Sequence, residues 1–261
     1  MKYLMAIPVL FMSLMCGAQI NNQLFSGRYL FFSENHTNNA ALPFVEGGVL
    51  TSNGQGSFQI FTTYNQGTSL PIISPNSGMA GSYTIAANGF GTISVNSGAG
   101  SFWIAPEHFF CQLSGDYCVA TSSESGRSWG AKFWRDKSPG PVITTLSGCY
   151  IFQSDGALNQ FSESGVMCFS GNGTYTLASI YNVALDPAHS NLTNPTPFTC
   201  GVISPMSYYG QGAIFEATQG LCPSTVGFDT FAIYCMMDGS MCVLVPDKNE
   251  AGGWVAEMRK Q

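Results

Sequence analysis

Charge is scarce in this sequence. Only 9% of its 261 residues are Asp, Glu, Lys or Arg, and the nine basic residues are outnumbered by fifteen acidic ones. An acidic surface repels phosphate, so we expect no nucleic-acid partner. Amphipathic helix patterns are missing, and no later stretch reaches the roughly 18 apolar residues that a membrane-spanning helix needs. We therefore expect neither a helical fold nor an integral membrane span.

The sequence also lacks the usual elements of a metal site. Its nine cysteines include no Cys-x-x-Cys pair, and its three histidines, His36, His108 and His189, have no partner at ligand spacing. Structural zinc sites place Cys and His at short, regular spacings. We therefore predict no metal and no other cofactor.

The first 18 residues follow the order of a secretory signal peptide. One lysine precedes an apolar run from Tyr3 to Met15, and small residues precede a cut after Ala18. The alternative is a lipid anchor at Cys16, although the residue before it is not small. Either alternative leaves eight cysteines that can pair in an exported chain, periplasmic or extracellular, where thiols oxidise to disulfides.

Five motifs occur twice, in the same order, at offsets of 117 to 125 residues. The pairs are Gly27-Arg28-Tyr29 with Gly148-Cys149-Tyr150, Gly48-Val49 with Gly165-Val166, Gly89-Phe90-Gly91 with Gly210-Gln211-Gly212, Cys111 and Cys118 with Cys235 and Cys242, and Trp129-Gly130-Ala131 with Trp254-Val255-Ala256. Repetition of this kind predicts a tandem duplication.

The repeat divides the mature chain into two units, residues 24–137 and 145–261, joined by a Pro- and Gly-rich linker at residues 138–144. Apolar residues alternate within each unit, and Gly turns separate the alternating runs, as half-buried antiparallel strands require. We predict an all-β fold of two tandem antiparallel meanders. Each unit is either a small β-barrel or a β-sandwich.

The repeated cysteine frame predicts a disulfide in a hairpin. If Ser114-Gly115 and Asp238-Gly239 are two-residue turns, Cys111 faces Cys118 and Cys235 faces Cys242 across two strands. Facing residues of a hydrogen-bonded pair have Cα atoms about 5.5 Å apart, which a disulfide can bridge. We therefore predict the pairs Cys111–Cys118 and Cys235–Cys242.

Four further cysteines belong to the second unit alone: Cys149, Cys168, Cys200 and Cys222. Arg28 and Thr51 take the places of Cys149 and Cys168 in the first unit. Four cysteines allow three connectivities, and the sequence does not choose among them. We expect two disulfides within the second unit.

The order of the motifs carries a resemblance to known families. The opening Gly-x-Tyr strand, the Gly-rich hairpins and the final Trp-x-Ala strand resemble calycins, the avidin and lipocalin type of barrel. Tyr29 and Tyr150 stand where calycins have tryptophan, and no ligand residue transfers. The turns Asn53-Gly54-Gln55-Gly56 and Asn88-Gly89-Phe90-Gly91 are similar to those in tandem domains of uncharacterised exported bacterial proteins, which implies a fold without a known activity.

One strand gathers positive charge beside tryptophan. Its candidate binding residues are Arg127, Trp129, Lys132, Trp134 and Arg135. Such a strand could bind an anionic glycan or an acidic protein surface through cation–π contacts. The alternative is an edge strand that its basic residues protect from pairing with other strands.

Two acidic residues recur at equivalent positions. Glu46 and Glu163 each precede a Gly-Val strand. A recurring carboxylate could act on a ligand, but a solvated strand entry explains the pattern as well. The segment from Gly126 to Gly130 spells Gly-x-Ser-x-Gly, yet the serine enters a strand rather than the strand-to-helix turn of a hydrolase.

Three functions fit these observations. The first is an exported, non-enzymatic binding or envelope-associated module whose partner is a small molecule, a glycan or a protein. The second is a carrier of a small apolar ligand inside a barrel. The third is a secreted hydrolase, for which the sequence shows no convergent acid, base and nucleophile.

Overall fold

The computed structural model describes residues 20–35, 45–65, 73–97, 106–123, 129–141, 143–156, 161–183, 192–207, 211–216, 230–246 and 254–261. The signal peptide and Cys16 lie outside these residues. The first set of strands comprises β1 (Ser26–Asn35), β2 (Val45–Asn53), β3 (Ser57–Asn65), β4 (Ile73–Ile85), β5 (Phe90–Ser97), β6 (Glu107–Cys111), β7 (Tyr117–Thr121) and β8 (Trp129–Arg135). The second set comprises β9 (Ser147–Gly156), β10 (Phe161–Ser170), β11 (Thr174–Val183), β12 (Leu192–Ile203), β13 (Gln211–Glu216), β14 (Thr230–Cys235), β15 (Met241–Pro246) and β16 (Trp254–Lys260).

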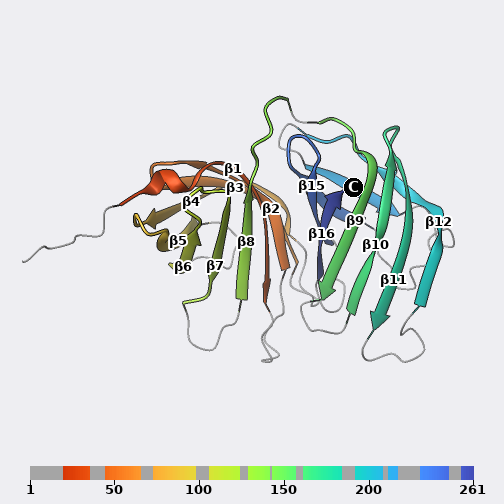
Figure 1. Ribbon diagram of the computed structural model, residues 1–261, viewed down its shortest axis with the longest axis horizontal. Helices are drawn as coiled ribbons and strands as arrows, with labels where there is room; N and C mark the ends of the chain where they lie inside the picture. The colour runs from red at the N-terminus through yellow and green to blue at the C-terminus, as the bar shows by residue number, and fades with distance from the viewer. Residues whose placement is uncertain are drawn as a thin grey trace, which may run out of the picture.

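Both sets of strands close into barrels (Figure 1). In barrel 1, β1 to β8 pair antiparallel in chain order, and β8 returns to β1. In barrel 2, β9 to β16 do the same, and β16 returns to β9. The predicted all-β fold of two antiparallel meanders is therefore confirmed, with the barrel rather than the sandwich as the outcome. The architecture fits a calycin-like barrel; the domain boundaries at residues 137 and 145 stay predictions.

Each barrel has a closed end and an opposite end that we call the mouth. In barrel 1 the mouth is the end marked by Asn35, Val45, Asn65 and Trp129, and tight turns join the strands at the closed end. In barrel 2 the corresponding mouth residues are Gly156, Phe161, Val183 and Trp254. The mouth ends of both barrels point to the bottom of Figure 1.

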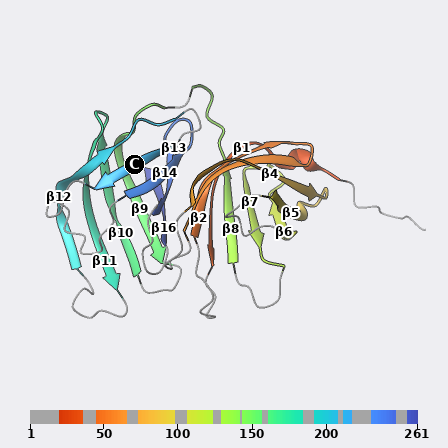
Figure 2. The same cartoon turned by 180° about the vertical axis from the view of Figure 1, so that it is seen from behind.

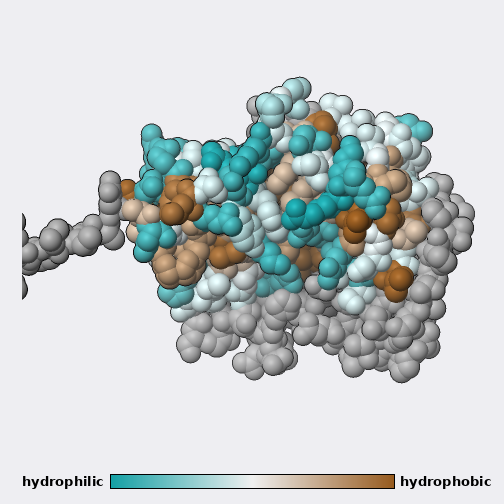
Figure 3. Space-filling model, viewed as in Figure 1, coloured by the Kyte–Doolittle hydropathy of each residue, from teal (hydrophilic) through white to brown (hydrophobic). Residues whose placement is uncertain are grey.

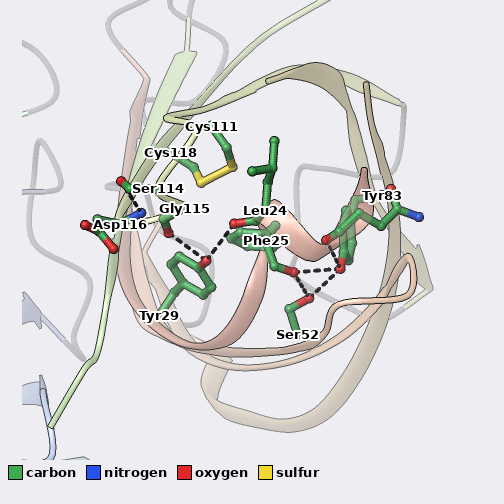
Figure 4. The surroundings of a disulfide bond; sticks show 11 residues. Leu24, Phe25, Tyr29, Ser52, Tyr83, Cys111, Ser114, Gly115, Asp116 and Cys118 are labelled. Atoms are coloured by element: carbon green, nitrogen blue, oxygen red, sulfur yellow. Dashed lines mark hydrogen bonds between the residues drawn. A yellow bond between two sulfur atoms is a disulfide. The ribbon is translucent and has the colours of Figure 1, made fainter. Parts of the chain in front are cut away.

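A short 3-10 helix, η1 (Asn22–Leu24), leads Phe25 into the closed end of barrel 1. The Phe25 ring lies 4.3 Å from the Tyr29 ring and 4.9 Å from the Phe109 ring, between ring centroids. Its carbonyl accepts a hydrogen bond from the Tyr83 hydroxyl at 2.7 Å (Figure 4). Aromatic side chains therefore fill the closed end of barrel 1.

The recurring Gly-x-Tyr motif has the same role in both barrels. The Tyr29 hydroxyl donates to the Gly115 carbonyl at 2.8 Å (Figure 4), and the Tyr150 hydroxyl donates to the Gly239 carbonyl at 2.6 Å. Both carbonyls belong to the turn of a cysteine hairpin. Burial raises the pKa of each tyrosine to about 12. Each phenol therefore fixes a hairpin to the first strand of its barrel.

The hairpins contain the predicted disulfides Cys111–Cys118 and Cys235–Cys242. The turn type differs from the prediction, because the Gly115 amide donates to the Gln112 carbonyl and closes a turn over residues 112–115. Gly115, the last residue of this turn, has a φ of 70°, a left-handed conformation that glycine adopts without strain. The longer turn keeps the predicted register, since Cys111 still faces Cys118.

A third disulfide joins Cys149 to Cys168 across β9 and β10. The registers make this pair equivalent to Arg28 and Thr51 in barrel 1, as the repeat predicts. The side chains of Cys200 and Cys222 lie outside the described residues. The three disulfides are consistent with an oxidising, exported location.

Removing one hairpin disulfide is expected to lower stability moderately. The double variant Cys111→Ser/Cys118→Ser should lose about 2.5 kcal/mol of unfolding free energy, because the closed loop is short. Urea denaturation of the oxidised protein measures the loss. An unchanged midpoint would mean that the contact between Tyr29 and Gly115 alone holds the hairpin.

The two barrels pack against each other through a third apolar core. Its members are Leu30, Phe32, Val45, Val49, Ala232, Tyr234, Met241, Val243, Val245 and Val255. They lie on the outer faces of β1 and β2 in barrel 1 and of β14, β15 and β16 in barrel 2; Figure 2 shows β2 beside β16. Gly47 allows this approach, since a Cβ there would lie 2.5 Å from Cγ2 of Val245. The Thr63 and Tyr234 hydroxyls are hydrogen-bonded at 2.8 Å across the same contact.

An ion pair completes the contact between the barrels. Arg28 on β1 pairs with Asp136, and the side chains of the two residues are 10% and 1% exposed. Arg28 also donates to the Cys235 carbonyl at 2.7 Å, and the Met237 amide donates to Asp136 at 2.7 Å. Burial lowers the pKa of Arg28, an effect that the neighbouring carboxylate opposes. The pair therefore fixes barrel 1 to the cysteine hairpin of barrel 2.

Within the described part of the chain, no helix is both long enough and apolar enough to span a membrane.

Candidate functional site

The structure divides the strand that the sequence singled out for binding. Trp129 is 5% exposed and points into barrel 1, whereas Lys132 and Trp134 lie on its outer face. Arg135 is half-buried at the closed end, beside Gly27. Arg127 lies outside the described residues. The candidate residues therefore do not form one patch, and a glycan or protein partner at this strand stays a prediction.

The alternative interpretation of this strand is wrong. β8 is not an edge strand, because it pairs with β7 on one side and with β1 on the other. A closed barrel has no edge for basic residues to protect. The side chain of Lys132 instead points outward into a groove that residues of both barrels line.

Lys132 lines a groove of about 420 Å³ between the barrels. The lining residues are Phe32, Glu34, Lys132, Ile151, Phe152, Gln153, Val255, Glu257 and Arg259. Lys132 lies over the Phe32 ring at 5.0 Å, and Arg259 forms an ion pair with Glu257 at 2.5 Å. Hydrophilic surface crosses the middle of the described face, with separate apolar patches on either side (Figure 3). Both basic groups of the groove therefore already interact within the protein, Arg259 with Glu257 and Lys132 with the Phe32 ring.

A second cluster of polar side chains lies inside the mouth of barrel 1. Ser33 on β1, Glu46 on β2 and Tyr64 on β3 are register neighbours, so they share one row across three strands. Ser33 continues the inward face of Tyr29 and Phe31, which places the whole row inside the barrel. Ser33 and Glu46 are fully buried and Tyr64 is 4% exposed.

Glu46 is the unusual member of this row. Neither of its carboxylate oxygens has a hydrogen-bond partner among the described residues, and the same holds for the Ser33 hydroxyl. Burial raises the pKa of Glu46 to about 8, and the neighbouring Thr62 hydroxyl acts in the opposite direction. That hydroxyl donates to the Gly47 carbonyl at 3.0 Å rather than to the carboxylate. An unsatisfied buried carboxyl group is costly, so Glu46 marks the mouth of barrel 1 as a candidate binding site.

Glu107 adds a second buried carboxylate at the mouth. It continues the inward face of Phe109 and Cys111 on β6 and is fully buried. One oxygen accepts a hydrogen bond from the Ser123 amide at 2.5 Å, while the other has no partner in the described part of the chain. β2 and β6 are four strands apart in a ring of eight, so Glu46 and Glu107 stand on opposite walls.

Barrel 2 repeats the row by register. Ser154 on β9, Glu163 on β10 and Tyr181 on β11 pair as Ser33, Glu46 and Tyr64 do in barrel 1. Glu163 is 9% exposed and Ser154 is 1% exposed. The same three residue types therefore lie at the mouth of each barrel.

The sequence contained the signal for this site in the recurrence of Glu46 and Glu163. Its interpretation as a solvated strand entry is wrong, since Glu46 is fully buried and Glu163 nearly so. Ser33, Tyr64 and Glu107 were missed, because their meeting with Glu46 depends on which strands pair. His108, by contrast, is exposed on β6, whereas the segment that contains the Gly-x-Ser-x-Gly serine lies outside the described residues.

Comparison with solved structures gives weak likenesses. No family model and no curated protein matches the sequence. Among solved structures, kievitone hydratase from Nectria haematococca has 11% identity and a TM-score of 0.23 over 92% of each chain. A protein of unknown function from the DUF3598 family of Nostoc punctiforme PCC 73102 has 10% identity and a TM-score of 0.24 over 92% of this chain and 98% of that chain. Likenesses at such TM-scores carry no argument about function.

Proposed function

We propose that this protein is an exported, non-enzymatic binding module that holds a small molecule in the mouth of barrel 1. The observation that carries the proposal is the buried carboxyl group of Glu46, which has no hydrogen-bond partner among the described residues. A ligand that donates hydrogen bonds to it would relieve the cost of burying it. Eight-stranded barrels are wide enough to hold one small ligand.

The polar side chains at the mouth argue against a purely apolar ligand. An apolar ligand could pack against Trp129 and Tyr64, but it would leave Glu46 and the Ser33 hydroxyl without partners. A ligand with both an apolar body and a polar group suits the two kinds of lining. Most small-molecule sites combine an apolar lining with a few convergent polar groups.

Native mass spectrometry tests the proposal. The oxidised protein, purified from the compartment to which it is exported, should carry a small-molecule mass that unfolding releases. The variant Glu46→Ala should lose this mass, whereas Asp116→Asn, an exposed residue of the closed-end hairpin, should keep it. The proposal is contradicted if the wild type carries no such mass or if Glu46→Ala retains it.

A substrate screen separates binding from catalysis. We expect no turnover of ester or glycoside substrates by the wild type. Turnover that disappears in Glu46→Ala would instead assign the mouth to an enzyme, because it would make the carboxyl group part of the chemistry.

A further inference from the structure

In the part of the chain that the structure describes, the inside of barrel 1 contains two buried carboxyl groups and no basic side chain. Its inward-facing carboxylates are Glu46 and Glu107, each with at least one oxygen that lacks a partner in the described part of the chain. The basic side chains that the structure describes in and just after barrel 1 lie elsewhere: Arg28, His108, Lys132, Arg135 and Lys137. A ligand with positive charge would therefore complement the mouth.

The mouth also offers aromatic surface. Trp129 on β8 and Tyr64 on β3 are buried, with 5% and 4% exposure, and both face inward at the same end of the barrel as Glu46. Tryptophan and tyrosine rings attract organic cations through their faces. The combination of opposed carboxylates with aromatic rings is suited to an ammonium group that is attached to an apolar body.

A metal ion fits this chemistry less well. Among the described residues, no group of three or more His, Cys, Asp or Glu side chains could hold a metal. Calcium takes six to eight oxygen ligands, and two carboxylates on opposite walls supply too few.

We infer that the ligand of barrel 1 is a small organic cation, an alkyl- or arylammonium compound whose ammonium group binds Glu46. This inference rests on the proposed function and adds the chemical class of the ligand. Glu107 and Trp129 complete the site, the first by its carboxyl group and the second by its ring. The ammonium group replaces the missing hydrogen-bond donors of Glu46 and pairs with its charge.

Isothermal titration calorimetry on the oxidised protein tests the class of ligand with matched probes. Each probe pair is a primary amine and the corresponding alcohol, from ethylamine and ethanol through hexylamine and hexanol to 2-phenylethylamine and 2-phenylethanol. At least one amine should bind about tenfold or more tightly than its alcohol, since the alcohol lacks the charge. Glu46→Gln should remove this preference, and Asp116→Asn should preserve it.

The pH dependence provides an independent readout. Glu46 must lose its proton to pair with an ammonium group, so the affinity for the amine should rise by close to tenfold between about pH 6.5 and 7.5 and level off above about pH 8.5. The other titratable groups toward Glu46 are Tyr64 on β3, Tyr234 on β14 behind the barrel wall, and Glu107 on β6; Ser33 and Thr62 do not titrate. Phenols ordinarily titrate near pH 10, outside this range. Glu107 is retained in Glu46→Gln, so the comparison isolates Glu46.

The outcomes separate the inference from the proposed function. If no amine binds in a manner that depends on Glu46, or if alcohols bind equally well, the inference is overturned. The proposed function then survives only if native mass spectrometry finds a neutral or anionic mass that Glu46→Ala loses. Loss of both signals overturns both statements.

Discussion

Replacing Asp136 with alanine is expected to lower the free energy of unfolding by about 3 to 5 kcal/mol. The variant leaves Arg28 buried beside the second barrel without its carboxylate, and it removes the acceptor of the Met237 amide. Breaking a buried pair from one side costs more than the pair contributes, because the remaining charge stays away from water. The loss should weaken the contact between the barrels, since Arg28 on β1 and Asp136, the residue after β8, both bind the hairpin of barrel 2.

Chemical denaturation measures this effect with a control from the same region. Asp116 pairs with Lys137 at 2.7 Å on the surface, where the side chains are 36% and 64% exposed. Asp116→Ala should change the midpoint little, because solvent screens an exposed pair. Asp136→Ala should also separate the single transition into two, as the barrels uncouple. Equal midpoints for the two variants would contradict a structural role for the buried pair.

The fold followed from short-range patterns in the sequence. The two cysteine frames fixed the hairpin register even though the turn type was wrong, because the pairing of Cys111 with Cys118 depends on the midpoint of the hairpin and not on the turn's backbone. The alternation of apolar and polar residues correctly predicted the inward face of β8, where Trp129 and Phe133 are buried. Local rules of this kind need no knowledge of distant segments.

The contact between the barrels was not predicted, although the sequence contained a sign of it. Residues Tyr29, Leu30, Phe31 and Phe32 are apolar on both faces of one strand, and all four are buried. A strand that is apolar on both faces is typical of one covered on both sides. The partner of its outer face could not be deduced, because β14 and β15 lie about 200 residues further along the chain. Arg28, the counterpart of Cys149, also takes part in this contact, because its guanidinium donates to the Cys235 carbonyl of barrel 2.

The candidate site was only half visible in the sequence. The recurrence of a glutamate drew attention to Glu46, but a charged residue at a strand entry was expected to face solvent. Only the pairing of Glu46 with Ser33 and Tyr64 shows that it faces the barrel interior. Glu107 has no acidic counterpart in the repeat and could not be found in this way. The basic strand was the more visible signal and the less informative one, because Lys132 and Trp129 lie on opposite faces of the barrel wall.

Replacing Glu46 with glutamine is expected to change how stability depends on pH. Burial raises the pKa of Glu46 to about 8, whereas a glutamate in the unfolded chain titrates near 4.5. The folded state therefore favours the protonated form of Glu46. The contribution of this preference to the free energy of unfolding is fully present below about pH 4.5. As the pH rises from about 4.5 to 8, Glu46 ionises in the unfolded chain but stays protonated in the folded protein. The free energy of unfolding should therefore fall by on the order of 4 kcal/mol over this range.

Urea denaturation between about pH 5 and 9 measures this dependence, with the difference between wild type and variant as the readout, since other groups titrate in both. Glu46→Gln cannot ionise, so it should gain stability over the wild type as the pH rises, even if its amide makes it less stable at pH 5. Asp116→Asn is the control, because a hydrogen bond from Lys137 lowers the pKa of Asp116 and keeps it ionised throughout this range. If the difference between wild type and Glu46→Gln were independent of pH, Glu46 would be in contact with water, and the mouth of barrel 1 would no longer need a ligand to satisfy it.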